Sequence, residues 1–398
     1  MKYVSEEVIA DVLLMLGIII IVAKLFEELI GRLGQAPILG DILTGLVLGP
    51  SFLGLITQRF IDEIEVLKWI GIASLLFLAG LETRFSLFMK SLKSSLSIAL
   101  SGIIVSFILG YFGGLAMGFS NTQSIFLGAI LTATSVGITV RTLSDIGALG
   151  TDTATVILGA AVLDDVGGLL VLGLCTAIVT AGSTRIVELL ITTLIAIVFY
   201  ITIVFSLHRT STIIWSRLTK LAHLEDTSIA VLLALTLIIA WASVKVNLSL
   251  VVGAYAVGLA FSEIRGVERV VKRFSLIPNI FASLFFVLSV ATIDIKQYVT
   301  SMGYVTVMVI IVLLAILGKV IGCGLAARLL KFKWAESIFV GIGMMPRAEV
   351  ALIIASIGMA YGVVSKEVFA GVVLLIYVTS ILAPILLELL WKRYLKKQ

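Results

Sequence analysis

The sequence is poor in charge. Only 13% of its 398 residues are Asp, Glu, Lys or Arg, which is about half the share usual in soluble domains. Apolar residues make up 60% of the chain, and the mean hydropathy is +1.20. A long polar stretch is also missing, so we expect no nucleotide-binding, regulatory or extracellular domain. This composition excludes a water-soluble fold and predicts a polytopic helical membrane protein.

Cysteine and histidine are equally scarce. Cys175 and Cys323 both lie in apolar runs, and His208 and His223 flank one basic loop. Neither pair predicts a disulfide framework or a resident metal site, and we expect no cofactor. The N-terminus lacks the basic start and the small-residue cleavage site of a signal peptide, so we expect the first apolar run to be retained as a span.

Apolar segments fill the rest of the chain. Crossing a bilayer takes about 20 apolar residues in a helix, and a window of that size predicts an all-α fold with 13 membrane-spanning helices. The expected spans are 8–30, 37–56, 66–82, 92–118, 123–146, 153–181, 186–207, 228–245, 248–262, 275–292, 303–328, 336–360 and 367–390.

The basic residues predict the orientation. With an external N-terminus, seven of the 29 Lys and Arg residues fall outside: Lys2, Arg59, Lys68, Arg185, Lys245, Lys296 and Lys366. Lys319 and Arg347 lie inside spans, and the remainder fall on the cytoplasmic side. Loops rich in Lys and Arg stay on the cytoplasmic side of a membrane. We therefore expect a protein of the cell membrane whose C-terminus lies in the cytoplasm. The net charge of +5 follows from this asymmetry and predicts lipid headgroups, not nucleic acid, as partners.

Charged residues in the middle of spans are candidate functional residues, because each costs about 2.5–3.5 kcal/mol at the bilayer centre. Five meet this description: Asp164, Asp165, Lys319, Arg347 and Glu349. Four other acids lie near span ends, where we expect them to reach water: Asp41, Glu82, Glu263 and Glu388.

Asp164 and Asp165 are neighbours in the sixth expected span. Adjacent side chains on a helix point about 100° apart, so the two carboxylates cannot converge on one atom. One can line a cavity while the other faces a cation on a neighbouring helix. Lys319, between Gly318 and Gly322 of the eleventh span, needs a carboxylate partner, and one of the two aspartates is the natural candidate. A purely structural ion pair is the alternative.

Two spans carry residues that interrupt helices. The fifth has the run 131–139 with four hydroxyls and a glycine, and the twelfth has Pro346 between two glycines and two charges. Proline breaks a helix, and broken helices at membrane depth line binding sites in transporters. Arg347 and Glu349 are expected to offset the helix dipoles at the break, with a direct role for Glu349 left open. For the Thr134 hydroxyl, the alternative to a functional role is an ordinary hydrogen bond back to a preceding carbonyl of its own helix.

The paired interruptions predict an inverted repeat. A shift of about 212 residues superposes Thr134 on Pro346 and gives a first repeat at 8–182, a linking helix at 183–208 and a second repeat at 226–398. Under the same shift neither Asp164 nor Lys319 meets a charged residue. The two repeats would therefore carry an asymmetric site, with acids from one and a base from the other.

Five motifs in register resemble a known family. They are the run 132–139, the Asp164–Asp165 pair after 158–163, Leu317-Gly-Lys319, the run 343–350 and the run 78–83. Together they resemble the sodium/proton antiporters of the cation:proton antiporter-2 family, and closely its NapA-type members. The resemblance covers essentially the whole chain.

The resemblance implies a homodimer. Spans 1–3 and 8–10 would form a dimerisation domain, and spans 4–6 and 11–13 a core ion-transport domain that moves like an elevator. It further implies that Asp165 binds the ion, Asp164 pairs with Lys319, and Thr134 is an auxiliary ligand. Relatives with a Gln-Asp motif and a cytoplasmic nucleotide-sensing domain are potassium efflux systems, and this chain lacks both features.

The residues also suggest a mechanism. Na+ prefers several oxygen ligands, and burial favours the protonated carboxylate, so H+ competes with Na+ at one site. Competition combined with alternating access is exchange, with Li+ or K+ as possible substitutes for Na+. The sequence contains neither the selectivity-filter motif of a channel nor the catalytic motifs of an intramembrane enzyme, which argues against both functions. A sodium-coupled solute symporter is the serious alternative.

Overall fold

A computed structural model describes residues 6–33, 35–180, 183–221, 225–291 and 302–395. Every regular element in these ranges is helical. The elements are α1 (Glu6–Arg32), α2 (Ile38–Leu48), α3 (Gln58–Glu82), α4 (Phe85–Ala116), α5 (Asn121–Thr132), α6 (Val136–Asp145), α7 (Asp152–Thr180), α8 (Ser183–Leu221), α9 (Glu225–Lys245), α10 (Leu250–Phe261), α11 (Val267–Phe274), α12 (Leu276–Ala291), α13 (Met302–Leu329), α14 (Trp334–Gly343), α15 (Glu349–Ala360), α16 (Lys366–Leu390) and the π-helical turn η2 (Trp391–Leu395).

Each expected apolar segment coincides with a helix or a pair of helices. The largest differences lie at the boundaries. Helix α2 ends at Leu48, before a Gly-Pro pair, whereas α8 continues to Leu221. The short helix α11 was not expected, because it is amphipathic, with Val270 and Phe274 buried and charged residues on its other face. The interruptions expected in the fifth and twelfth segments are confirmed, since α5 is separate from α6 and α14 from α15.

Long apolar helices identify an integral membrane protein. Among the described residues, eight helices are long and apolar enough to cross a membrane, or nine if the bent pair α11–α12 is one span. Helix α1 exposes Leu13 and Leu14 at 62% and 66%. Such large apolar side chains are stable on an outer surface that faces lipid.

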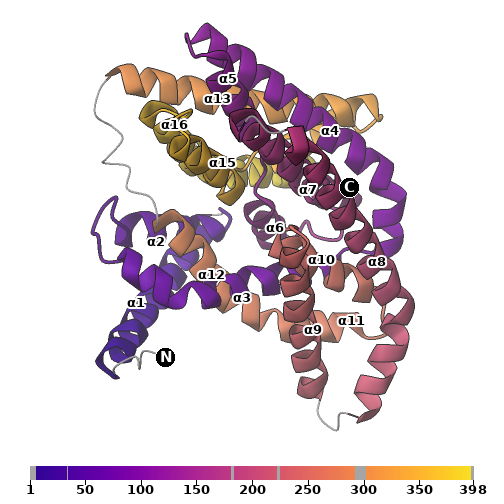
Figure 1. The fold of residues 1–398 in the computed structure, drawn as a ribbon. Coiled ribbons are helices and arrows are strands. Elements are labelled where there is room, and N and C mark those ends of the chain that lie inside the picture. The colour runs from indigo at the N-terminus through magenta and orange to yellow at the C-terminus, as the bar shows by residue number, and fades with distance from the viewer. Residues whose placement is uncertain (1–5, 34, 181–182, 222–224, 292–301, 396–398) are drawn as a thin grey trace.

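The helices form two bundles (Figure 1). In the first bundle, α3 packs on α10 and α12, and α2 packs on α1 and α12. In the second bundle, α4 packs on α5, α7 and α13, and α13 packs on α14 and α16. Helix α8 runs along the edge of both bundles, with contacts to α7 and α10. Helix α6 lies between the bundles and contacts α7 and α16 on one side and α2 and α3 on the other.

Glycines allow the closest helix contacts. A Cβ atom on Gly258 of α10 would lie 2.1 Å from the Phe77 carbonyl oxygen of α3, so these two backbones touch. In α13, a Cβ on Gly318 would lie 2.8 Å from the Ser106 Oγ, and a Cβ on Gly322 would lie 3.0 Å from a carbonyl oxygen of α4. The two glycines beside Lys319 therefore bring α13 against α4, as their spacing predicted.

Candidate functional site

The two interrupted segments meet in the second bundle. The chain is extended at Ala133 and Ser135, between α5 and α6. The Ser135 backbone N–H donates to the Pro346 carbonyl at 2.8 Å, and Thr139 Oγ1 donates to the Gly343 carbonyl at 2.7 Å. These bonds join the first break to the second. The carbonyls of Gly343 and Pro346 accept hydrogen bonds from the Thr139 side chain and the Ser135 backbone, so donors from the first interrupted segment satisfy carbonyls of the second.

Arg347 occupies the centre of this crossing with no exposed surface. Its guanidinium donates to the carbonyls of Leu131 at 2.9 Å and of Met344 and Met345 at 3.2 Å each. These carbonyls belong to the C-terminal ends of α5 and α14, where the helix dipoles are negative and acceptors are unsatisfied. Arg347 therefore makes the contacts with helix-end carbonyls that charge compensation at the breaks requires. The side chain of Glu349 lies outside the described part of the structure.

Thr134 lies within the same crossing and is 4% exposed. Its hydroxyl donates to the Met344 carbonyl at 3.3 Å and accepts from Arg347 Nη1 at 3.5 Å. The hydroxyl thus links both breaks instead of bonding back within its own helix. Its use as an ion ligand stays a prediction.

Lys319 and Asp164 form an ion pair between α13 and α7. Lys319 Nζ lies 2.6 Å from Asp164 Oδ1, and the two side chains are 0% and 1% exposed. Gly102 of α4 lies beside this ammonium group and lets α13 approach, because a Cβ there would overlap the Cys323 Sγ of α13. Among the described residues, Asp164 Oδ2 has no hydrogen-bond donor. One acid of the double aspartate is thus committed to Lys319.

Asp165 is half-buried in α7, whereas Asp164 is buried. This difference follows from the helical rotation of about 100° between neighbours. One turn further along α7, Gly168 faces Val350 of α15, so Asp165 lies on the part of α7 that approaches the second interrupted segment. The arrangement separates a paired carboxylate from a more accessible one.

Two acids that sequence reasoning expected to reach water, Asp41 and Glu388, are buried in the structure, with exposures of 0% and 5%. Two basic residues counted at the interfaces, Lys68 on the outer side and Arg141 on the cytoplasmic side, are also covered by neighbouring helices, with exposures of 9% and 5%. Hydropathy along the chain cannot show which distant helices cover a residue. An available signal was the spacing of Arg141 and Asp145, which suits an i,i+4 ion pair on one helix face.

Comparison with known proteins points to one family. Residues 17–393 match the profile of the family described as "Sodium/hydrogen exchanger, transmembrane". A relative in Bacillus cereus, the probable Na(+)/H(+) antiporter GerT, is 36% identical over 361 residues that cover 90% of this chain and 94% of the relative. The Na(+)/H(+)-K(+) antiporter GerN of the same organism is 33% identical, with 94% of each chain covered.

Solved structures agree at the level of the fold. The sodium proton antiporter MjNhaP1 of Methanocaldococcus jannaschii, determined at pH 8, aligns with a TM-score of 0.70 at 17% sequence identity. The alignment covers 98% of this chain and 99% of that chain.

Proposed function

Since this chain belongs to the sodium/hydrogen exchanger family, we propose that it exchanges Na+ for H+ across a membrane by alternating access. The observation that carries the proposal is the buried Lys319–Asp164 pair beside the half-buried Asp165, in a bundle built on two interrupted helices. A fixed negative charge near broken helices is what a small desolvated cation requires. The relatives GerT and GerN, named as Na(+)/H(+) and Na(+)/H(+)-K(+) antiporters, support Na+ and H+ as the two exchanged ions.

Asp165 is the proposed ion-binding carboxylate. It can hold either H+ or Na+, with the Thr134 hydroxyl as a further oxygen ligand for Na+. Asp164 points about 100° away on the helix and adds its negative charge to the Na+ site. If the core reorients only when the site is occupied, each cycle exchanges one ion for the other. Alternate binding of H+ and Na+ at one site is the activity of a transporter, and the proposal assigns no catalytic chemistry to the protein.

Lys319 is the proposed switch. When Na+ recruits the aspartates, Lys319 loses its partner in a site with no exposure, and release of a proton from the unpaired ammonium is the proposed response. A second proton released from Asp165 would give two H+ per Na+ and a net movement of charge. The exchange is therefore expected to be electrogenic.

The proposed architecture has 13 spans in two inverted repeats, with α8 as the link between them. The first bundle would be the dimerisation domain of a homodimer, and the second bundle the core that moves as an elevator. The helix contacts support this division, because α6 is the interrupted segment that contacts both bundles.

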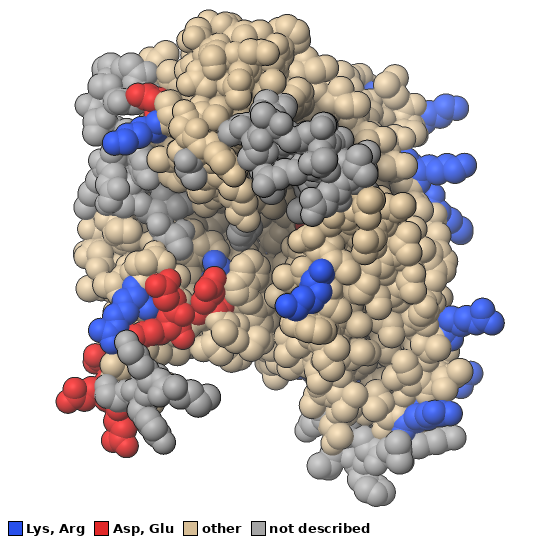
Figure 2. Space-filling model, in the orientation of Figure 1, with Lys and Arg blue, Asp and Glu red and all other residues tan. Residues whose placement is uncertain are grey.

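The proposed orientation places the N-terminus outside and the C-terminus in the cytoplasm of a plasma membrane. In Figure 2, only Lys and Arg side chains are visible along the right-hand edge, whereas the visible Asp and Glu lie at the left together with further Lys and Arg. Such an asymmetry matches a basic cytoplasmic rim.

A second candidate function is potassium/proton exchange. It is supported by the relative GerN, which is a Na(+)/H(+)-K(+) antiporter. The test of both is purified protein in proteoliposomes with an internal pH dye, challenged in turn with Na+, Li+ and K+. We expect Na+ to drive proton movement, and Asp165→Asn to abolish it while folding and yield persist. Asp165→Asn activity above about a tenth of wild type would overturn the assignment, and sodium-driven solute uptake without proton movement would favour a symporter.

A further inference from the structure

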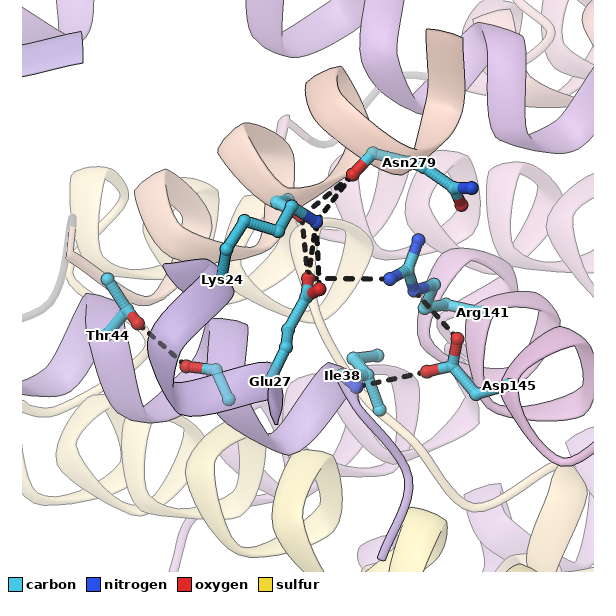
Figure 3. Close-up of polar contacts among 9 residues, drawn as sticks. Lys24, Glu27, Ile38, Thr44, Arg141, Asp145 and Asn279 are labelled. Carbon is cyan, nitrogen blue, oxygen red and sulfur yellow. Dashed lines mark hydrogen bonds and ion pairs between the residues drawn. The ribbon is translucent and has the colours of Figure 1, made fainter. Parts of the chain in front are cut away.

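A second group of charges, with Asp41 and Arg141 buried at its centre, lies where α1, α2, α6 and α12 meet (Figure 3). We call it the Glu27 cluster, and it consists of Lys24, Glu27, Asp41, Arg141 and Asp145. The cluster is separate from the Asp164–Lys319 pair, and the exchange mechanism proposed above does not use it. It lies in the contact between the two bundles, because α6 reaches the first bundle there.

Glu27 is held by α1 and α12. Lys24 Nζ lies 2.8 Å from the Glu27 carboxylate and also donates to the Asn279 carbonyl at 2.6 Å. The Ser283 hydroxyl of α12 donates to Glu27 Oε1 at 2.9 Å. Figure 3 shows Lys24 pointing toward both the Glu27 carboxylate and the Asn279 carbonyl. The carboxylate is therefore positioned with several donors before α6 contributes anything.

Arg141 ties α6 to this carboxylate. Its Nη2 lies 3.5 Å from Glu27 Oε1, and its Nε lies 3.1 Å from Asp145 Oδ1 one turn further along α6. The other oxygen of Asp145 accepts the Ile38 backbone N–H at 3.0 Å. Ile38 is the first residue of α2, and Pro37 before it offers no side-chain cap. Asp145 therefore caps α2 from another helix, where a negative charge is favoured by the dipole.

Asp41 is the residue that this arrangement does not satisfy. Its side chain has no exposed surface, and neither carboxylate oxygen has a hydrogen-bond donor among the described residues. The adjacent Gly40 packs directly against the Glu27 backbone, so α2 places Asp41 next to Glu27, whose carboxyl group is its hydrogen-bonding neighbour. Two carboxyl groups can bond to each other only when one of them carries a proton. A buried carboxylate with neither donor nor proton would pay the full cost of desolvation.

The charge count gives the same result. The cations of the cluster are Lys24 and Arg141, and its acids are Glu27, Asp41 and Asp145. Helix α12 contributes only the neutral groups of Asn279 and Ser283 to the contacts of the cluster. One bound proton therefore makes the cluster neutral, which is the state that burial favours.

We propose that Asp41 and Glu27 together hold one proton, at a site separate from Asp164 and Asp165, in the contact between α6 and the α1–α2 pair. Loss of this proton leaves two adjacent carboxylates in a buried site, where they repel each other and attract the Arg141 guanidinium more strongly. The consequence for transport rests on the proposed function. If α6 moves with the core, each cycle must break the Arg141–Glu27 contact, so the shared proton makes that contact sensitive to pH.

The proton can be observed without any transport. Infrared spectra of the full-length protein in lipid bilayers at neutral pH, without Na+, report the carbonyl stretch of protonated carboxylic acids, which shifts in heavy water. We expect the wild type minus Asp41→Asn difference to contain one such band, because the amide has the same shape and bears no acid proton. Asp145→Asn should leave the band, since Arg141 Nε at 3.1 Å and the Ile38 N–H at 3.0 Å both favour the carboxylate form of Asp145. Exposed Asp62 on α3 provides Asp62→Asn as the surface control.

Thermal stability supplies a second measurement. The folded protein binds the shared proton and the unfolded chain gives it up, so the melting temperature of wild type should fall as pH rises through the titration of the pair. Asp41→Asn should lose this part of the slope and Asp62→Asn should keep it. An acid band unchanged in Asp41→Asn, or removed by Asp145→Asn, would overturn the proposal. Absence of exchange by wild type would overturn only the proposed function, because neither measurement needs a gradient.

Discussion

Replacing Lys319 by Gln tests the ion pair most directly. The pair is short, at 2.6 Å, and both side chains are essentially unexposed. Removing one partner of such a pair leaves an uncompensated buried charge, which costs about 3–5 kcal/mol. The cost here should lie in that range, because Asp164 Oδ2 already lacks a donor among the described residues and Oδ1 would lose the charge that compensates it.

The assay is thermal unfolding in detergent, followed by intrinsic fluorescence and by the monodisperse fraction on size exclusion. The matched control is Arg32→Gln, which removes a 2.8 Å ion pair to Glu28 in which the two side chains are 76% and 65% exposed. Exposed pairs contribute about 1 kcal/mol or less, so the control should unfold near wild type. The double variant Lys319→Gln/Asp164→Asn should recover most of the lost stability, because it removes the unpaired charge.

Transport currents on a solid-supported membrane separate the switch from a structural pair. Lys319→Gln should still bind Na+, seen as a Na+-dependent rise in melting temperature, but should show a reduced or absent current. If Lys319→Gln is as stable as Arg32→Gln, the burial argument is wrong. If it exchanges Na+ for H+ with an unchanged current, Lys319 is a structural counter-charge and the switch fails.

Three further predictions concern the rest of the molecule. Cysteines at Glu27 and Arg141, on a background with Cys175 and Cys323 replaced, should stop exchange when joined by a short reducible reagent and recover on reduction; unaffected exchange would show that α6 does not move relative to α1. Gly258→Ala should lower the melting temperature by several degrees, since its Cβ would overlap the α3 backbone, and an unchanged melting temperature would refute that contact. Impermeant thiol labelling in intact cells should reach a cysteine at residue 2 but not one at the C-terminus, and the reverse pattern would overturn the orientation.

Local features of the sequence were sufficient for the helical fold and for part of the site. Apolar runs located the helices because a bilayer or a buried bundle requires many consecutive apolar residues. Pro346 predicted the interruption of the twelfth segment because a proline removes a backbone donor wherever it stands in a helix. Asp164, Asp165 and Lys319 were identifiable for the same kind of reason, since each charge is anomalous against its own immediate neighbours.

Burial of the remaining charges depended on tertiary structure. Asp41 and Arg141 lie close to span ends in the sequence, where either could face water, and both are buried because α1, α2, α6 and α12 meet around them. The bond from Ile38 to Asp145 joins residues 107 apart in the chain, and no periodicity or hydropathy window extends that far. A residue type predicts the cost of burying a charge, but only the packing of distant helices decides which charges are buried and which partners they find there.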